Sequence, residues 1–276
     1  MKLIHLTDPH FVPKGEKLYG RNPREALDAA VKDINFYHSD ANAVVITGDL
    51  THWGESAAFS NLASCLAPLK PPLQLLVGNH DKRDTFCKYF PAQSTDENGF
   101  VQSTMVTDEG TLVFLDTILD GTHAGHYCQL RLSWLSQTLA KIPGDIFLFM
   151  HHPPFETGIP AMDLISLKQK SAFWDIISPH KSHIRHLFFG HIHRNISGSW
   201  NGIPFSSVRS TNHQVWLDFS STDIQGSFEP PAYAIVVVDD TRVLIHYHDY
   251  MDPSEKYKLN DSRWDDWSRK YLNRKK

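Results

Sequence analysis

The sequence predicts an α/β fold built in layers, and two observations support this. Short apolar segments alternate with amphipathic helical segments early in the chain, in the order β-α-β-α-β, which is typical of layered α/β folds. The apolar segments are nearly continuous, which indicates strands buried on both faces. With 276 residues, 41% of them hydrophobic, the chain can bury the core of one large domain, or of one domain with an appendage.

The strands are predicted at short apolar segments that are bounded by Gly, Asp or Pro. They cover residues 3–7, 43–47, 73–77, 111–116, 146–150, 186–189, 205–208, 233–238 and 242–247. The later strands come without long helices between them. We therefore expect antiparallel pairs there, in a second sheet that packs on the first.

The helices are predicted where apolar residues recur at helical spacing. Asn22-Pro23-Arg24-Glu25 is a start signal, with a capping residue, Pro at the first helical position and Glu three residues after the cap. The apolar faces that follow from this spacing are Leu27, Ala30, Val31 and Ile34; Phe59, Leu62, Ala63 and Leu66; Trp134, Leu135 and Leu139; and Phe173, Trp174 and Ile177.

Composition and charge exclude several classes of protein. The net charge is -4, without a block of like charge, so we expect no large nucleic-acid partner. No apolar segment approaches the ~20 residues that a membrane span needs, and the N-terminus enters a strand without the layout of a signal peptide. The three cysteines show no Cys-x-x-Cys spacing, so we expect reduced thiols in a cytoplasmic protein.

Five short motifs carry side chains that bind metals, and four of them follow directly on a predicted strand. In an open α/β sheet, ligands gather at the carboxyl ends of strands, so side chains from distant motifs can converge there. Glycine precedes three of the ligands and lets the backbone approach an ion closely. The motifs are Asp8-Pro9-His10, Gly48-Asp49, Gly78-Asn79-His80-Asp81, His151-His152 and Gly190-His191-Ile192-His193.

The ligands sort into two predicted metal sites that share Asp49, the natural bridge between two ions. His152 is expected to have a supporting role. Oxygen and imidazole ligands without thiolate suit Mn, Fe, Co or Zn. Two such ions about 3.5–4 Å apart leave a net positive centre, suited to an anionic phosphodiester. The first site is predicted to hold Asp8, His10, Asp49 and His193, and the second Asp49, Asn79, His151 and His191.

The order of the motifs, D-x-H, G-D, G-N-H-D, H-H-P-P and G-H-x-H, resembles that of the calcineurin-like metallophosphoesterases. Within them it is similar to the branch with class III cyclic-nucleotide phosphodiesterases and bacterial glycerophosphodiester phosphodiesterases. The resemblance implies a four-layer α/β/β/α sandwich of two mixed sheets and a centre of two divalent metal ions held by the seven ligands. It also implies that His80 stabilises phosphate or protonates the leaving group. His213 would lie near the substrate, with a buried structural role as the alternative.

The expected function is a metal-dependent hydrolase that cleaves small phosphodiesters, either cyclic nucleotides or glycerophosphodiesters, by attack of a metal-bridging hydroxide. A phosphonate monoester hydrolase or a phosphomonoesterase would use the same centre, and a non-catalytic metal-binding scaffold is a third alternative. Loops at residues 11–21, 120–130 and 155–167 and the segment around His213 are expected to select the substrate. Further candidates for contact, each expected at the surface instead, are Tyr19, Arg21, His52, Trp53, His123 and His126.

Residues 1–250 are expected to form the catalytic domain, and residues 251–276 a C-terminal extension. The extension is polar and charged with scattered aromatic residues, and we expect a helix that packs on the domain or on a partner subunit. The protein is expected to be a homo-oligomer, a dimer or larger, without a membrane partner. The aromatic residues of the extension are Tyr257, Trp264, Trp267 and Tyr271.

Overall fold

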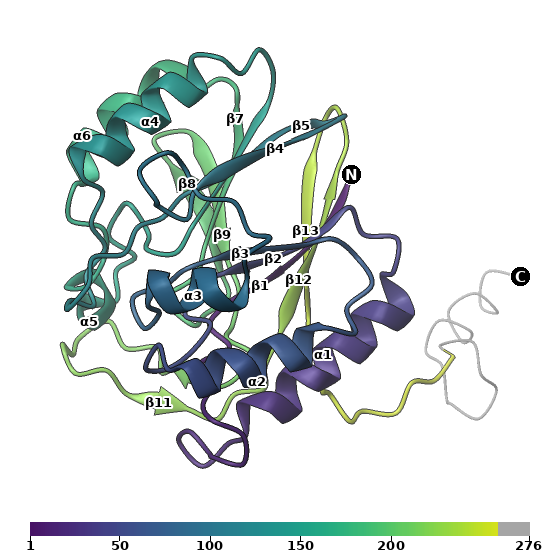
Figure 1. The fold of residues 1–276 in the computed structure, drawn as a ribbon. Helices are drawn as coiled ribbons and strands as arrows, with labels where there is room; N and C mark the ends of the chain where they lie inside the picture. Colours follow the sequence, from purple (N-terminus) through teal and green to yellow (C-terminus); the bar gives the residue numbers. More distant parts are fainter. Residues whose placement is uncertain (259–276) are drawn as a thin grey trace, which may run out of the picture.

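The computed structural model describes residues 1–258, which contain two large β-sheets (Figure 1). The first sheet has the strand order β13-β12-β1-β2-β3. Strands β1, β2 and β3 are parallel, whereas β12 runs antiparallel to its neighbours β1 and β13, so the sheet is mixed. The strands are β1 (Lys2–Leu6), β2 (Ala43–Thr47), β3 (Leu73–Leu76), β12 (Tyr233–Val238) and β13 (Val243–His248).

The second sheet has the order β4-β5-β6-β7-β9-β8 and is also mixed. Its four central strands are parallel, and each edge strand runs antiparallel to its neighbour. A short antiparallel pair, β10 (Gln214–Val215) with β11 (Gly226–Ser227), lies apart from both sheets. The strands of the second sheet are β4 (Ser103–Thr107), β5 (Gly110–Phe114), β6 (Ile146–Met150), β7 (Ile184–Phe189), β8 (Ile196–Trp200) and β9 (Ile203–Ser207).

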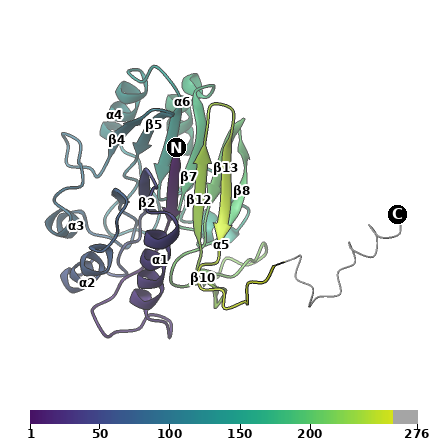
Figure 2. The same cartoon turned by 90° about the vertical axis from the view of Figure 1, so that its right-hand side faces the viewer.

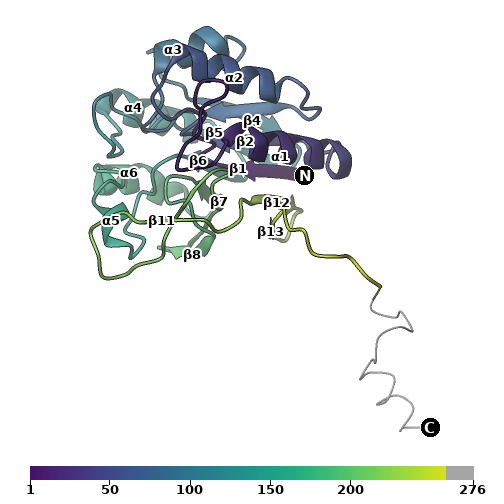
Figure 3. The same cartoon turned by 90° about the horizontal axis from the view of Figure 1, so that it is seen from below.

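Helices cover the outer face of each sheet. Helix α1 begins where the capping signal predicts, because the Asn22 side chain accepts a hydrogen bond from the Arg24 backbone N–H at 3.1 Å. Helices α1, α2 and α3 lie together on one side of the molecule (Figure 3), and α4 and α6 lie side by side (Figure 1). The helices are α1 (Pro23–Tyr37), α2 (Ser56–Leu66), α3 (Arg83–Tyr89), α4 (Gln129–Leu139), α5 (Pro160–Asp163), α6 (Lys170–Ile177) and the 3-10 helix η1 (Ser178–His180).

Three buried clusters join these layers. One packs α1–α3 on the first sheet, a second packs α4 and α6 on the second sheet, and a third fills the space between the sheets. In the third cluster the rings of Phe149 and Phe188 stack at 4.6 Å between centroids. The order of layers is therefore helices, sheet, sheet, helices, which confirms the predicted four-layer α/β/β/α sandwich of two mixed sheets.

The prediction that the later strands form the second sheet is wrong for β12 and β13. These two strands pair with each other, but β12 also pairs with β1 and so extends the first sheet (Figure 2). The free edge of β1 offers unpaired backbone groups, and an antiparallel hairpin satisfies them. The sequence also did not predict β4, β8, α3 and the short α5.

No regular element is present over residues 253–258, so the predicted C-terminal helix is absent from that part. Trp264, Trp267 and Tyr271 lie outside the described residues. Among residues 1–258, no helix is long and apolar enough to cross a membrane. The cysteines Cys65, Cys87 and Cys128 form no disulfide. The predicted division at residue 250 and the homo-oligomer stay predictions.

Candidate metal centre

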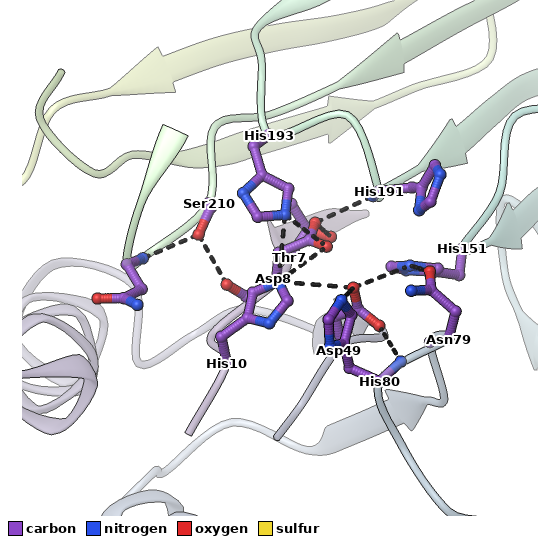
Figure 4. A network of polar contacts seen from close by, with 12 residues as sticks. Thr7, Asp8, His10, Asp49, Asn79, His80, His151, His191, His193 and Ser210 are labelled. Carbon is purple, nitrogen blue, oxygen red and sulfur yellow. Dashed lines mark hydrogen bonds and ion pairs between the residues drawn. The ribbon is translucent and has the colours of Figure 1, made fainter. Parts of the chain in front are cut away.

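The motif residues lie at the carboxyl ends of strands from both sheets (Figure 4). Asp8, Asp49 and Asn79 follow β1, β2 and β3, which are adjacent and parallel in the first sheet. His151 and His191 follow β6 and β7, which are adjacent and parallel in the second sheet. Because the two sheets are packed face to face, the five strand ends meet at one edge of the sandwich, as the sequence predicts.

The backbone at this edge adopts a conformation that most residues avoid. Five of the seven predicted ligands have φ between 46° and 70°, in the left-handed region. Non-glycine residues seldom occupy this region, although Asp and His tolerate it better than most. Such strain persists where the surrounding structure enforces it, and it concentrates at functional sites. The five residues are Asp8, His10, Asp49, His191 and His193.

Glycines allow the loops to come this close. A Cβ atom on Gly78 would collide with the backbone nitrogen and the carboxylate of Asp49. A Cβ atom on Gly190 would collide with the Thr7 hydroxyl. Both positions therefore require glycine, which confirms the role that the sequence predicts for the glycines before the ligands.

The four residues of the first predicted site form one buried group. Their ligand atoms all lie within 4.8 Å of one another. His10 Nε2 lies 3.2 Å from His193 Nε2 and 3.5 Å from Asp49 Oδ2, and His193 Nε2 lies 3.2 Å from Asp8 Oδ1. Ligands at about 2.0–2.1 Å around a tetrahedral ion are separated by about 3.3 Å. Asp8 Oδ1 is buried without a hydrogen-bond partner, so this group fits a cation.

Three residues of the second predicted site also converge. His151 Nε2 lies 3.4 Å from Asp49 Oδ2 and 3.2 Å from Asn79 Oδ1. The fourth, His191, has a ring nitrogen within 4.8 Å of those of His151 and His152, and its Nε2 is buried without a partner. Buried polar atoms usually have a hydrogen-bond partner. A buried imidazole nitrogen that has none, beside two other imidazole rings, is suited to bind a metal ion.

Hydrogen bonds from outside the group orient several of the ligands. His151 Nδ1 donates to the Thr47 carbonyl at 2.7 Å, and His193 Nδ1 donates to the His213 carbonyl at 2.7 Å, which leaves the Nε2 atoms for the site. The Asn79 amide nitrogen lies 2.9 Å from His123 Nδ1, so the amide oxygen faces His151. Partners of this kind fix the ring orientation of metal-binding histidines.

Burial and the neighbouring carboxylates set the protonation of the cluster. Burial lowers the pKa of His10 and of His191 well below the ordinary value. For His151 the effect of burial is outweighed by the Asp49 carboxylate, which raises the pKa to about 9. Burial favours neutral Asp49, but His151 and the other histidines hold its pKa well below the ordinary value. The ionised Asp49 carboxylate and the neutral His10 and His191 suit a cation, whose binding would release the proton from His151.

A pocket of about 230 Å³ opens over this group, and His80 and His213 face it. The His80 side chain is 18% exposed, and its Nδ1 donates to the His52 carbonyl at 2.8 Å, so Nε2 is the atom left to meet a ligand. The His213 ring lies 4.8 Å from the His10 ring and 4.6 Å from the His193 ring. The structure thus brings both residues to the site, beside the cluster of Asp8, His10, Asp49 and His193 and not within it.

Two residues beside the site are more deeply buried than the sequence indicates. His52 was expected at the surface, but it is only 4% exposed and its ring stacks on His80 at 4.8 Å. It is buried because the backbone after Asp49 folds against Phe11, whose carbonyl accepts a hydrogen bond from the His52 N–H. Asp81 is also buried, and its carboxylate accepts hydrogen bonds from the loops after β2 and β3.

His152 has the predicted supporting position. Its Nδ1 lies 2.8 Å from the Thr117 hydroxyl, and its Nε2 lies 3.1 Å from the His123 carbonyl. Both ring nitrogens therefore have protein partners, whereas Nε2 of the neighbouring His191 has none.

The sequence model of the family described as "Calcineurin-like phosphoesterase" matches residues 1–195. A relative from Rhodopseudomonas palustris, named a probable cyclic nucleotide phosphodiesterase, is 46% identical over 267 residues, which cover 95% of this chain and 97% of the relative. The chain belongs to the calcineurin-like phosphoesterase family. This confirms the predicted family and, with it, a hydrolytic phosphoesterase.

Two further relatives of this calcineurin-like phosphoesterase have more distant sequences. One is named a probable glycerophosphodiester phosphodiesterase and comes from Arcobacter nitrofigilis; it is 29% identical and covers 84% of this chain and 86% of the relative. The other is the 3′,5′-cyclic adenosine monophosphate phosphodiesterase of Escherichia coli; it is 28% identical and covers 76% of each chain. The chain's relatives are thus named for two kinds of phosphodiesterase activity.

Solved structures support the fold. A purple acid phosphatase from yellow lupin gives a TM-score of 0.65 at 14% identity, over 92% of this chain and 52% of that chain. The GAP50 protein of Plasmodium gives a TM-score of 0.60 at 11% identity, over 93% of this chain and 87% of that chain. The family together with the histidine and aspartate groups supports the binding of divalent metal ions.

Proposed function

We propose that this phosphoesterase hydrolyses small phosphodiesters at a centre of two divalent metal ions, with cyclic nucleotides as its principal substrates. The observation that carries the proposal is the position of Asp49. Its Oδ2 lies 3.5 Å from His10 Nε2 and 3.4 Å from His151 Nε2, so a single oxygen faces both groups of ligands. A carboxylate in that position can bridge two ions in one centre. The names of the relatives favour phosphodiesters as substrates.

The two ions, drawn from Mn, Fe, Co or Zn, would be held by the seven predicted ligands. The first would take Asp8, His10, Asp49 and His193, and the second Asp49, Asn79, His151 and His191. When bound, such ions supply an activated water nucleophile and neutralise charge on the phosphoryl oxygens. The left-handed backbone and the outer hydrogen bonds of the histidines hold these side chains in place for that purpose.

His80 is proposed to act on the substrate itself. Its Nδ1 proton is held by the His52 carbonyl, and its backbone N–H donates to Asp49 Oδ1 at 2.9 Å. Both contacts fix the ring so that Nε2 faces the pocket over the ligands. From there Nε2 can hydrogen-bond a phosphoryl oxygen or give a proton to the departing alkoxide. His213, whose ring lies 4.8 Å from the His10 ring, would contact the substrate.

The protein is also proposed to work in the cytoplasm as a dimer or a larger homo-oligomer. The cysteines Cys65, Cys87 and Cys128 are unpaired in the structure, as is usual where thiols stay reduced. Size-exclusion chromatography with light scattering would test the oligomer, and a monomer would contradict it.

A turnover panel at fixed manganese tests the function. It should include 3′,5′-cyclic AMP, a 2′,3′-cyclic nucleotide, glycerophosphoethanolamine, an aryl phosphonate ester and a phosphate monoester. We expect turnover of diesters, with cyclic AMP preferred. Faster turnover of the monoester or of the phosphonate ester would favour the alternative hydrolases, and no turnover with metal bound would favour a scaffold.

Two variants test the assignment of residues. Asp49→Ala should lose both metal binding and turnover, and full turnover in this variant would refute the proposed centre. His80→Ala should retain its metal but lose at least about 100-fold in kcat, the usual size of a proton-transfer contribution. His246→Ala, at an exposed position on β13, is the matched control. Loss of metal from His80→Ala would make His80 a ligand, against the proposal.

A further inference from the structure

An apolar pocket lies directly beside the pocket over the metal ligands. It has a volume of about 260 Å³. The two pockets share Tyr19, His213, Val215 and Ile224 in their linings, so they are adjacent. Each is smaller than the ~300 Å³ at which pockets for small organic ligands usually begin. A ligand larger than a bare phosphate ester would therefore occupy both.

The walls of this pocket are aromatic and aliphatic. Phe228 is 73% exposed, Tyr19 is 58% exposed and Ile224 is 55% exposed. The Tyr19 ring contacts the edge of the His213 ring, with 4.7 Å between centroids. Large apolar side chains that remain exposed next to a reactive centre indicate a surface that a ligand covers. Aromatic faces of this kind are suited to stack on a planar ring.

Two arginines hold the walls in place. Arg21 donates to the carbonyls of Asn212 at 2.7 Å and Phe228 at 2.6 Å, and its guanidinium lies 5.2 Å from the centre of the Phe228 ring. Arg194 donates to the Val215 carbonyl at 2.7 Å and pairs with Glu229 at 3.0 Å. The short antiparallel pair of β10 and β11 joins the two ends of the same segment. The pocket is therefore preformed, which lowers the entropy cost of binding.

We propose that the pocket lined by Tyr19, His213, Gln214, Val215, Ile224 and Phe228 binds the nucleobase of a cyclic nucleotide. The base stacks on the aromatic walls while the phosphodiester lies over the metal ligands. This inference rests on the proposed phosphodiesterase function and names the part of the substrate that this chain selects.

Substitution of Phe228 tests the stacking. We expect Phe228→Ala to raise the KM for 3′,5′-cyclic AMP about tenfold, the size of one base–aromatic contact, and to leave turnover of glycerophosphoethanolamine unchanged. Phe228→Tyr should keep the wild-type KM. The matched control is Phe219→Ala, which removes a phenylalanine that is 67% exposed on the same segment but does not line the pocket.

Two outcomes would overturn the inference while the hydrolysis of small phosphodiesters at the metal centre stands. One is an equal effect of Phe228→Ala on both substrates, or an effect no larger than that of Phe219→Ala. The other is a wild-type enzyme that cleaves glycerophosphoethanolamine and does not cleave cyclic AMP. A wild-type enzyme that cleaves none of the diesters would instead refute the proposed function itself.

Discussion

Asp81 is not a predicted ligand, yet its carboxylate joins the two loops that carry Asp49 and Asn79. Oδ1 accepts hydrogen bonds from the backbone N–H and the hydroxyl of Thr51, and Oδ2 accepts them from the N–H groups of Leu50 and Gly78, each at 2.9 Å. Asp81→Ala removes all four hydrogen bonds without touching a ligand. We expect it to loosen the metal centre and to destabilise the fold.

The hydrogen bonds set the expected size of the effect. A hydrogen bond to a charged group contributes about 1.5–3 kcal/mol, but four bonds to one carboxylate do not add, and water can replace part of them. We expect the free energy of unfolding to fall by about 3–5 kcal/mol. In a chain of this size that corresponds to a drop in Tm of about 10 °C. Asp81→Asn retains one acceptor oxygen and therefore two of the four hydrogen bonds, but its amide N–H group replaces the other acceptor and faces two donors. We expect this variant to lose about half as much free energy of unfolding as Asp81→Ala.

The assay combines thermal unfolding of the metal-free protein with a manganese titration. Asp81→Ala should show the lower Tm and a Kd for manganese at least about tenfold higher, because the Asp49 and Asn79 loops are no longer held together. Asp84→Ala removes an exposed carboxylate from the first turn of α3 and serves as the control. If the two variants had the same Tm and the same Kd for manganese, the argument that Asp81 positions the centre would be refuted.

Further predictions concern acid, the core and the metal. Burial lowers the pKa of His5 and of His186 to about 3, below the ~6.5 of unfolded histidine. As the pH falls, the unfolded chain therefore takes up protons before the folded chain does. The free energy of unfolding should be highest above about pH 6.5 and should decrease toward pH 3. Urea unfolding at pH 7 and 5 would show this, and His186→Gln should flatten the decline. Arg131→Leu removes a buried partner of Asp116 and should cost about 3 kcal/mol in urea unfolding; wild-type stability would contradict that. Chelation should lower the Tm, since ligand binding stabilises the native state, and an unchanged Tm after metal loss would argue against a buried centre.

The residues of the centre could be predicted because strand ends fix their position. Adjacent parallel strands end at the same edge of a sheet. Asp8, Asp49 and Asn79 therefore lie close together regardless of the conformation of the segments that connect the strands. The orientation of each ring could not be predicted. It depends on partners distant in sequence, such as the Thr47 carbonyl for His151. His52 could not be placed either, because its burial follows from loop packing against Phe11 and not from any pattern of its own.

The fold was predicted where a segment was a continuous apolar run and was missed elsewhere. Strand β4 alternates between half-buried and exposed residues at the edge of its sheet, and β8 reads Ile-Ser-Gly-Ser-Trp, with little apolar character. Helix α3 has only seven residues, with Phe86 as its buried contact. The sheet that receives β12 and β13 is decided by the free edge of β1, which is a property of the assembled sheet.

The left-handed backbone at the ligands has a consequence for how they should be mutated. Alanine at Asp49, where φ is 48°, removes the carboxylate and also places a less tolerant residue in a strained conformation. Glycine removes the carboxylate and relieves the strain, because it has no Cβ atom. The difference in unfolding free energy between Asp49→Gly and Asp49→Ala therefore measures what the backbone alone contributes. In a chain that no longer bound metals, the left-handed backbone would no longer be needed to position a ligand. Glycine would then be the least destabilising residue at position 49.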